Sequence, residues 1–97
     1  MSAANACLTG EWTIHAIAQH RDAMLTLVNE GCCSFDAAGI TEMDTAGVQL
    51  LLAAQRSIAR QGQELSLLQP SGVVKDVLKA YGLDANLNPL HGQEGTP

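Results

Sequence analysis

The chain is short and acidic, and its composition excludes several classes of protein. It has 97 residues, a formal net charge of −5 and 46% hydrophobic residues, which suits one packed core and excludes a disordered chain. The five basic residues are scattered, whereas a nucleic-acid surface needs clustered Lys and Arg. No stretch reaches the roughly 20 apolar residues that span a membrane, and no signal peptide is recognised. We therefore expect a cytoplasmic protein with no membrane insertion.

Along the whole chain, the sequence predicts strands and helices in alternation. Short apolar runs between turn residues are typical of buried strands, and apolar residues three or four apart are typical of amphipathic helices. The expected elements are a short strand at 6–8, a helix at 13–30, a strand at 32–36, a helix at 45–61, a strand at 64–68 and a helix from 72 to 81. Gly31, Gly62 and Gly82 follow the three helices, as is common at helix ends.

Turn residues set the predicted ends of the first two strands. Thr9-Gly10 ends the first strand, and Ala38-Gly39 forms a turn after a strand that ends at Asp36. Cys32 and Cys33 match neither a disulfide framework nor a zinc site, so we expect small strand residues, at least one of them buried.

In the third helix an apolar stripe is expected, formed by Val74, Val77, Leu78 and Tyr81. Leu83, Leu87 and Leu90 are expected to pack the segment after this helix. The chain is predicted to form one domain over 1–97 with an ordered core at about 6–90 and loose termini.

This order of elements predicts an α/β fold, with a small mixed β-sheet of about four strands covered by three to four helices. In such sheets, ligand and partner sites lie where strands end and helices begin. The stretch from Ser34 to Leu52 contains such a junction, so we expect the functional site there.

The helix start at Asp44-Thr45 is the most informative point of this stretch. Asp and Thr are both preferred at the first positions of a helix, because a side-chain oxygen can accept from a free backbone N–H group. The hydroxyl of Thr45 is therefore either a helix cap or an outward group at a place that favours a phosphate. Asp44 is either a cap or a carboxylate that recognises a partner, and Gly47 either allows close backbone approach or is a tolerated small residue.

The succession F-D-A-A-G-I-T-E-M-D-T-A-G-V-Q-L-L-L resembles the STAS domain of bacterial anti-sigma factor antagonists. The matching residues are Asp36, Gly39, Asp44, Thr45, Ala46 and Gly47, and the resemblance covers roughly Leu8 to Leu83. It implies that Thr45 is the phosphoacceptor. It also implies that a partner binds the surface from Asp36 to Val48, which includes Glu42.

The resemblance implies a protein partner, an anti-sigma factor that is a serine/threonine kinase, with ATP and magnesium held by that kinase. Thr45 and Ala46 depart from the family's Ser-Ser. This Thr-Ala variant resembles the STAS subunit of bacterial phospholipid-transport ABC complexes, which implies docking on the transporter's ATPase. It is also similar to STAS proteins associated with chemotaxis-type kinases.

No enzyme is predicted. The histidines at 15, 20 and 91 form no constellation with a nucleophile, and there is no P-loop or dinucleotide fingerprint. We therefore expect no catalytic residue, metal or cofactor in this chain.

Overall fold

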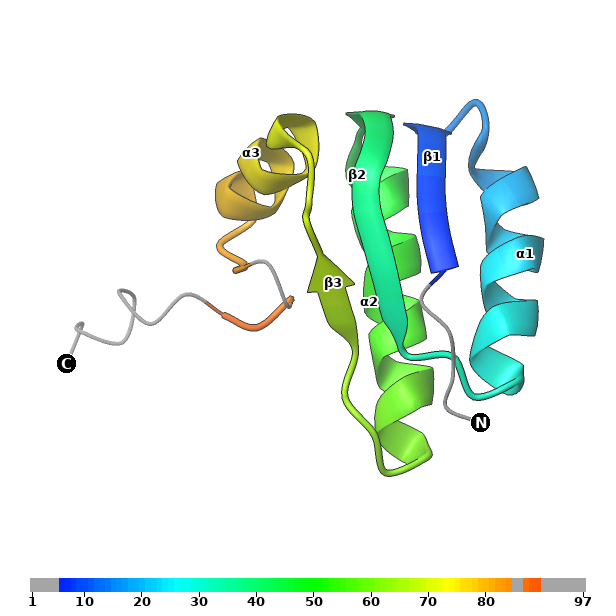
Figure 1. The fold of residues 1–97 in the computed structure, drawn as a ribbon. Helices are drawn as coiled ribbons and strands as arrows, with labels where there is room; N and C mark the ends of the chain where they lie inside the picture. Colours follow the sequence, from blue (N-terminus) through cyan, green and yellow to red (C-terminus); the bar gives the residue numbers. More distant parts are fainter. Residues whose placement is uncertain (1–5, 85–86, 90–97) are drawn as a thin grey trace, which may run out of the picture.

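The computed structural model describes residues 6–84 and 87–89, which form alternating strands and helices (Figure 1). The elements are β1 (Ala6–Trp12), α1 (Ile17–Asn29), β2 (Ser34–Met43), α2 (Thr45–Arg60), β3 (Ser66–Leu68) and α3 (Gly72–Ala80). The predicted α/β fold is confirmed. The termini that were expected to be loose, and Leu90, lie outside the described residues.

The three strands form one parallel sheet in the order β1-β2-β3. Figure 1 shows α2 crossing one face of this sheet, α1 beside β1, and α3 at the opposite edge. The described part thus has three parallel strands, where the sequence predicted about four in a mixed sheet. Of the described residues after α3, Leu83 and Pro89 form an isolated antiparallel bridge.

Both predicted strand ends in the first half are wrong, because the strands continue through the turn signals. β1 runs on to Trp12 with Gly10 at a φ of 83°, and its register against β2 shifts between Gly10 and Glu11. The extra residue at this shift lies on β2, and Gly10 can take its positive φ within β1 at little cost because glycine has no Cβ atom. β2 likewise passes through Gly39, where a Cβ atom would lie 2.7 Å from Cγ2 of Thr9. Gly39 therefore permits two strands to pair closely.

The starts of α2 and α3 are confirmed, and that of α1 is not. Asp44 and Ser71 cap α2 and α3 through side-chain oxygens that accept from the N–H groups of Ala46 and Val74. In contrast, α1 begins at Ile17 rather than Thr13 and has no side-chain cap. Ile14, which the helical pattern placed on an apolar face, is 66% exposed in the loop between β1 and α1.

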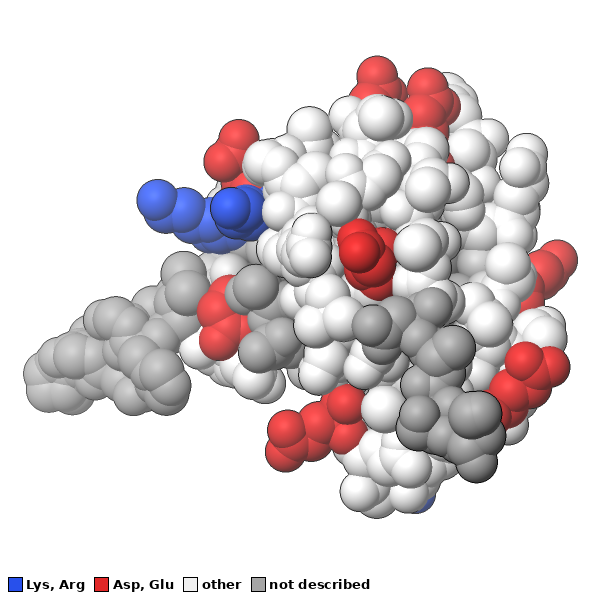
Figure 2. Space-filling view, in the orientation of Figure 1, with Lys and Arg blue, Asp and Glu red and all other residues white. Residues whose placement is uncertain are grey.

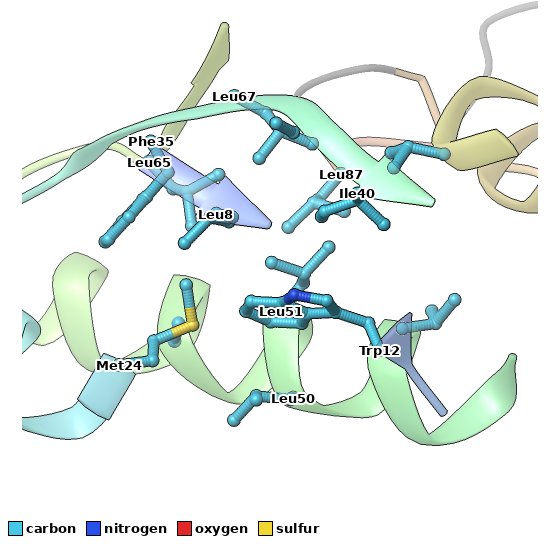
Figure 3. Close-up of a cluster of buried hydrophobic side chains, with 14 of the residues drawn as sticks. Leu8, Trp12, Met24, Phe35, Ile40, Leu50, Leu51, Leu65, Leu67 and Leu87 are labelled. Atoms are coloured by element: carbon cyan, nitrogen blue, oxygen red, sulfur yellow. The ribbon is translucent and has the colours of Figure 1, made fainter. Parts of the chain in front are cut away.

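The core is largely aliphatic and fills the space between the sheet and the helices (Figure 3). Its largest fully buried side chains include Trp12, Phe35, Met24, Ile40 and Leu51. Leu87 is also buried, so the segment after α3 closes part of the core as expected. Cys32 is buried, as expected for at least one of the cysteine pair, but the prediction that the pair lies in a strand is wrong, because β2 begins at Ser34. Within the described residues, no helix has the length and apolar character needed to cross a bilayer.

Candidate functional site

The candidate site lies where β2 ends and α2 begins. Met43 is the last residue of β2, Asp44 is the N-cap, and Thr45 is the first residue of α2. In a parallel sheet all strands end at the same edge, so the loop after β1 lies beside this junction. The site is therefore built from the β1–α1 loop and the first turn of α2.

Asp44 holds these two segments together. Its Oδ1 atom accepts from the N–H of Ala46 at 2.8 Å, and its Oδ2 atom accepts from the N–H of Ile14 at 3.0 Å. Its backbone N–H donates to the carbonyl oxygen of Trp12 at 3.3 Å. The carbonyl oxygen of Asp44 accepts from the N–H groups of Gly47 and Val48, at 3.0 and 3.2 Å. Asp44 thus uses both its side chain and its backbone to fix the helix start.

These bonds also keep the carboxyl group ionised. The backbone N–H of Ile14 is the largest cause that lowers the pKa of Asp44 below its ordinary value of 3.8. The N–H groups of Ala46 and Gly47 and the nearby charge of His15 lower the pKa of Asp44 further, while desolvation acts in the opposite direction. A full negative charge therefore stands next to Thr45 at neutral pH.

Thr45 is exposed, and its hydroxyl takes no part in capping, since Asp44 is the cap. The cap interpretation of Thr45 is therefore excluded by the geometry. The Thr45 hydroxyl instead is hydrogen-bonded to the hydroxyl of Tyr81, which is 36 residues away in the sequence. The N–H groups that were expected to receive a phosphate are already taken, because those of Ala46, Gly47 and Val48 donate to Asp44.

Gly47 lies underneath the site and lets the helix approach β1. It is buried, and a Cβ atom on it would lie 2.5 Å from the carbonyl oxygen of Trp12 and 2.9 Å from Cγ of Met43. Real Cβ atoms do not come so close to backbone oxygen. The first turn of α2 can therefore pack on the end of β1 only with glycine here.

Val48 was predicted to contact a partner, and its burial corrects this. Its side chain is 2% exposed and belongs to the hydrophobic core. The reason is the helical period: Val48, Leu51 and Ile58 share the face of α2 that packs on the sheet, whereas Thr45 and Gln49 point outward. Ala46 is half-buried and lies between the two faces.

The remaining predicted residues lie along β2. Glu42 is exposed one residue before the end of the strand and pairs in register with Glu11. Asp36 precedes Met43 by seven positions, which places it about 20 Å away at the usual rise of a strand. Its Oδ1 atom accepts from the N–H of Ala38 at 2.9 Å. Asp36 and Gly39 are therefore not brought to the helix start, because the strand does not end at Asp36.

The charges on this side of the molecule are unevenly distributed (Figure 2). The strands carry Glu11, Asp36 and Glu42 and no Lys or Arg, while Lys75 and Lys79 are exposed on α3. In Figure 2 the basic side chains accordingly gather at the position of α3, and acidic ones stand over the sheet. The end of the sheet next to Thr45 is therefore acidic, with Glu11, Glu42 and Asp44 close to one another.

Tyr81 is the residue that the sequence analysis missed. It was placed on the buried stripe of the third helix, but it is the C-cap of α3 and is 48% exposed. Val74 and Leu78 of the same stripe are buried, and Val77 is half-buried. Among the described residues, the exposed large hydrophobic side chains are Ile14, Val73 and Tyr81. Ile14 is hydrogen-bonded to Asp44 and Tyr81 to Thr45, so exposed apolar surface lies at the site.

Comparisons with known proteins agree with this fold. The family model described as "Mlab, STAS domain" matches residues 4–90. Among solved structures, the chain is similar to that of the anti-sigma factor antagonist SpoIIAA in its unphosphorylated form. The TM-score is 0.68 and the sequence identity 24%, over 98% of this chain and 87% of that chain. A comparison with curated proteins finds no match. From the family match over almost its whole length, this chain belongs to the STAS domain family.

Proposed function

We propose that the chain is a non-enzymatic regulatory module of the anti-sigma factor antagonist type, which binds a protein partner around Thr45. The observation that carries this proposal is the exposed Thr45 hydroxyl on the first residue of α2, left free of capping by Asp44. A protein similar in fold is an anti-sigma factor antagonist whose structure is named for its unphosphorylated form. Such a module would act in the cytoplasm.

The proposed surface is defined by exposure and position. Glu42, Asp44, Thr45 and Ala46 form its centre, and Ile14 and Tyr81 lie at its sides. Gly47 and Val48 support it from beneath. The surface combines exposed apolar area with carboxylates, which suits a partner that presents an apolar side chain near a basic one.

Phosphorylation of Thr45 would switch this surface. The partner, a serine/threonine kinase of the anti-sigma type, would transfer the γ-phosphoryl group of its bound ATP to Oγ1 of Thr45. The new O–P bond forms as the bond to the ADP oxygen breaks, and the hydroxyl proton passes to a base of the kinase. The phosphate would add about −1.5 to −2 charges beside the ionised Asp44. Because the N–H groups of Ala46, Gly47 and Val48 already donate to Asp44, this repulsion is poorly compensated, and the complex weakens.

The direct test uses a purified anti-sigma serine/threonine kinase from the source organism, ATP and this chain. We expect mass spectrometry to place one phosphate on Thr45, and calorimetry to show weaker binding by Thr45→Asp than by Thr45→Ala. Thr26→Asp is the matched control, since Thr26 is also exposed but lies on α1, outside the proposed surface. An unmodified Thr45 together with full binding by Thr45→Asp would contradict the switch.

A second candidate function is docking on the ATPase of an ABC transporter for phospholipids or other solutes. Two observations favour it: the Thr45-Ala46 pair resembles the phospholipid-transport STAS subunit, and the matching family model is described as "Mlab". Here Thr45 would be a contact residue that is never phosphorylated. Co-purification from native cells, with the partner identified by mass spectrometry, separates the two. An ATPase with its permease supports docking, whereas a kinase or sigma regulator supports the switch, and a chemotaxis-type kinase supports a role in that signalling system.

A further inference from the structure

Tyr81 stands at the junction between α3 and the segment after it. Its backbone N–H donates to the carbonyl oxygens of Val77 and Leu78, at 3.2 and 3.0 Å, so its Cα position is set by the end of α3. Its ring is not set in this way, because Tyr81 is 48% exposed. The hydrogen bond between its hydroxyl and that of Thr45 therefore fixes the ring and the Thr45 side chain together.

The donors near Thr45 make this bond significant. The N–H groups of Ile14, Ala46, Gly47 and Val48 all donate to Asp44. In the described part of the chain, the Tyr81 hydroxyl is the side-chain group that is hydrogen-bonded to Thr45, and either hydroxyl can be the donor. Any group added to Oγ1 of Thr45 removes the hydrogen that this oxygen carries and occupies space beside the Tyr81 hydroxyl. The Tyr81 ring then has to move, whether its hydroxyl follows the new oxygens or leaves them.

The end of α3 is bonded to the segment from Leu83 to Pro89. The N–H of Leu83 donates to the carbonyl oxygen of Leu78 at 2.9 Å, and Leu83 forms the antiparallel bridge with Pro89. The N–H of Asp84 donates to the carbonyl oxygen of Asn88 at 2.8 Å, and Leu87 between them is buried in the core. Displacement of the Tyr81 ring would therefore disturb the C-terminal end of α3, from which this segment continues.

We propose that Tyr81 is a positioning residue for Thr45 that transmits the chemical state of Thr45 to the C-terminal end of α3. In the unmodified chain the Tyr81 hydroxyl holds the Thr45 side chain in one orientation. When Thr45 carries a phosphate, Tyr81 is displaced and the last turn of α3 loosens. The inference rests on the proposed role of Thr45 as the residue that is modified, and it adds the end of α3 to the surface that changes.

The experiment uses the fact that Tyr81 is the only tyrosine of the chain. Tyrosine labelled with ¹³C in the ring gives NMR signals from Tyr81 alone. The full chain is compared with Thr45→Val, which removes the hydroxyl but keeps the shape, and with chain carrying phosphothreonine at 45 by translational incorporation. Gln49→Glu is the matched control, because it adds a negative charge at an exposed position one turn further along α2.

We expect the Tyr81 ring signals to shift in Thr45→Val and in the phosphorylated chain, and to stay in place in Gln49→Glu. Identical Tyr81 signals in unmodified, Thr45→Val and phosphorylated chain would overturn the proposal.

Amide exchange tests the transmission to α3. Phosphorylation at 45 should speed hydrogen exchange of the Tyr81, Gly82 and Leu83 amides several-fold, and this response should be absent in Tyr81→Phe. An equal response in Tyr81→Phe would also overturn the proposal. Since the phosphate is installed without a kinase or a partner, failure here leaves the binding function untouched. Conversely, a partner whose affinity does not change when Thr45 is substituted would refute the proposed binding function, but it would not refute the coupling of Thr45 to Tyr81.

Discussion

The Oδ2 atom of Asp44 accepts a hydrogen bond from the backbone N–H of Ile14 at 3.0 Å, although 30 residues separate them in the sequence. The same carboxylate caps α2 through Ala46. One side chain thus joins the loop after β1 to the helix that presents Thr45, so the shape of the proposed surface depends on the charge of Asp44.

This dependence predicts a loss of stability in acid. Because the folded-state pKa of Asp44 is lowered, the ionised carboxylate adds stability that is fully present above the unfolded pKa and disappears as the pH falls through the folded pKa. Urea unfolding followed by Trp12 fluorescence should show wild type and Asp44→Asn differing by a constant amount above about pH 5. The difference should shrink below the ordinary value of 3.8. The control is Asp76→Asn, which removes the charge of an exposed carboxylate on α3. A difference that stays constant down to the lowest pH would contradict the role of the Asp44 charge.

Gly47→Ala should destabilise the fold by about 1–3 kcal/mol, because the added methyl group meets the Trp12 carbonyl oxygen and an over-packed core has to shift. Gly72→Ala is the matched control. It lies at the start of α3 with no atom within 4 Å of the added Cβ, so its free energy of unfolding should stay unchanged or rise by up to about 1 kcal/mol. Denaturant midpoints measure both. Equal effects of the two substitutions would show that α2 does not press on the end of β1.

Val48→Ala should lower the free energy of unfolding by about 2 kcal/mol, since two buried methyl groups are lost from the core. The affinity of the folded protein for its partner should be unchanged. Val73→Ala, at a position that is 36% exposed, should cost less than about 1 kcal/mol. Wild-type stability together with reduced affinity for the partner in Val48→Ala would contradict this prediction and would indicate that Val48 contacts the partner.

Ile14→Ser should leave the free energy of unfolding within about 0.5 kcal/mol of wild type, because the side chain is 66% exposed and its backbone bond to Asp44 is retained. Binding of the partner recovered by co-purification should weaken several-fold, as measured by calorimetry. Ala23→Ser, on an exposed position of α1, is the control and should bind normally. Normal binding by Ile14→Ser would place the partner elsewhere.

The two capped helix starts were predictable because they are local. Asp44 reaches the N–H of Ala46 two residues on, and Ser71 reaches that of Val74 three residues on. Side chains of this type need no information from the rest of the chain. The start of α1 has no such cap, and its prediction from apolar spacing alone was wrong by four residues.

The strand ends were not predictable, because each depends on the neighbouring strand. Gly10 and Gly39 are turn residues in many sequences, but here Gly10 takes a positive φ within β1 and Gly39 allows two paired strands to approach closely. The prediction that β2 stops at Asp36 therefore failed, and with it the placement of Asp36 at the site.

By itself, the sequence determined the α/β order of elements and the starts of α2 and α3, but it left open whether the Thr45 hydroxyl caps α2 or points outward. Capping and apolar spacing act over a few residues, so they can be read along the chain. Only the tertiary structure decided that Val48 is buried, that Ile14 is exposed, and that Tyr81 meets Thr45. Contacts across 30 or more residues depend on how strands and helices pack, and no local pattern encodes that packing.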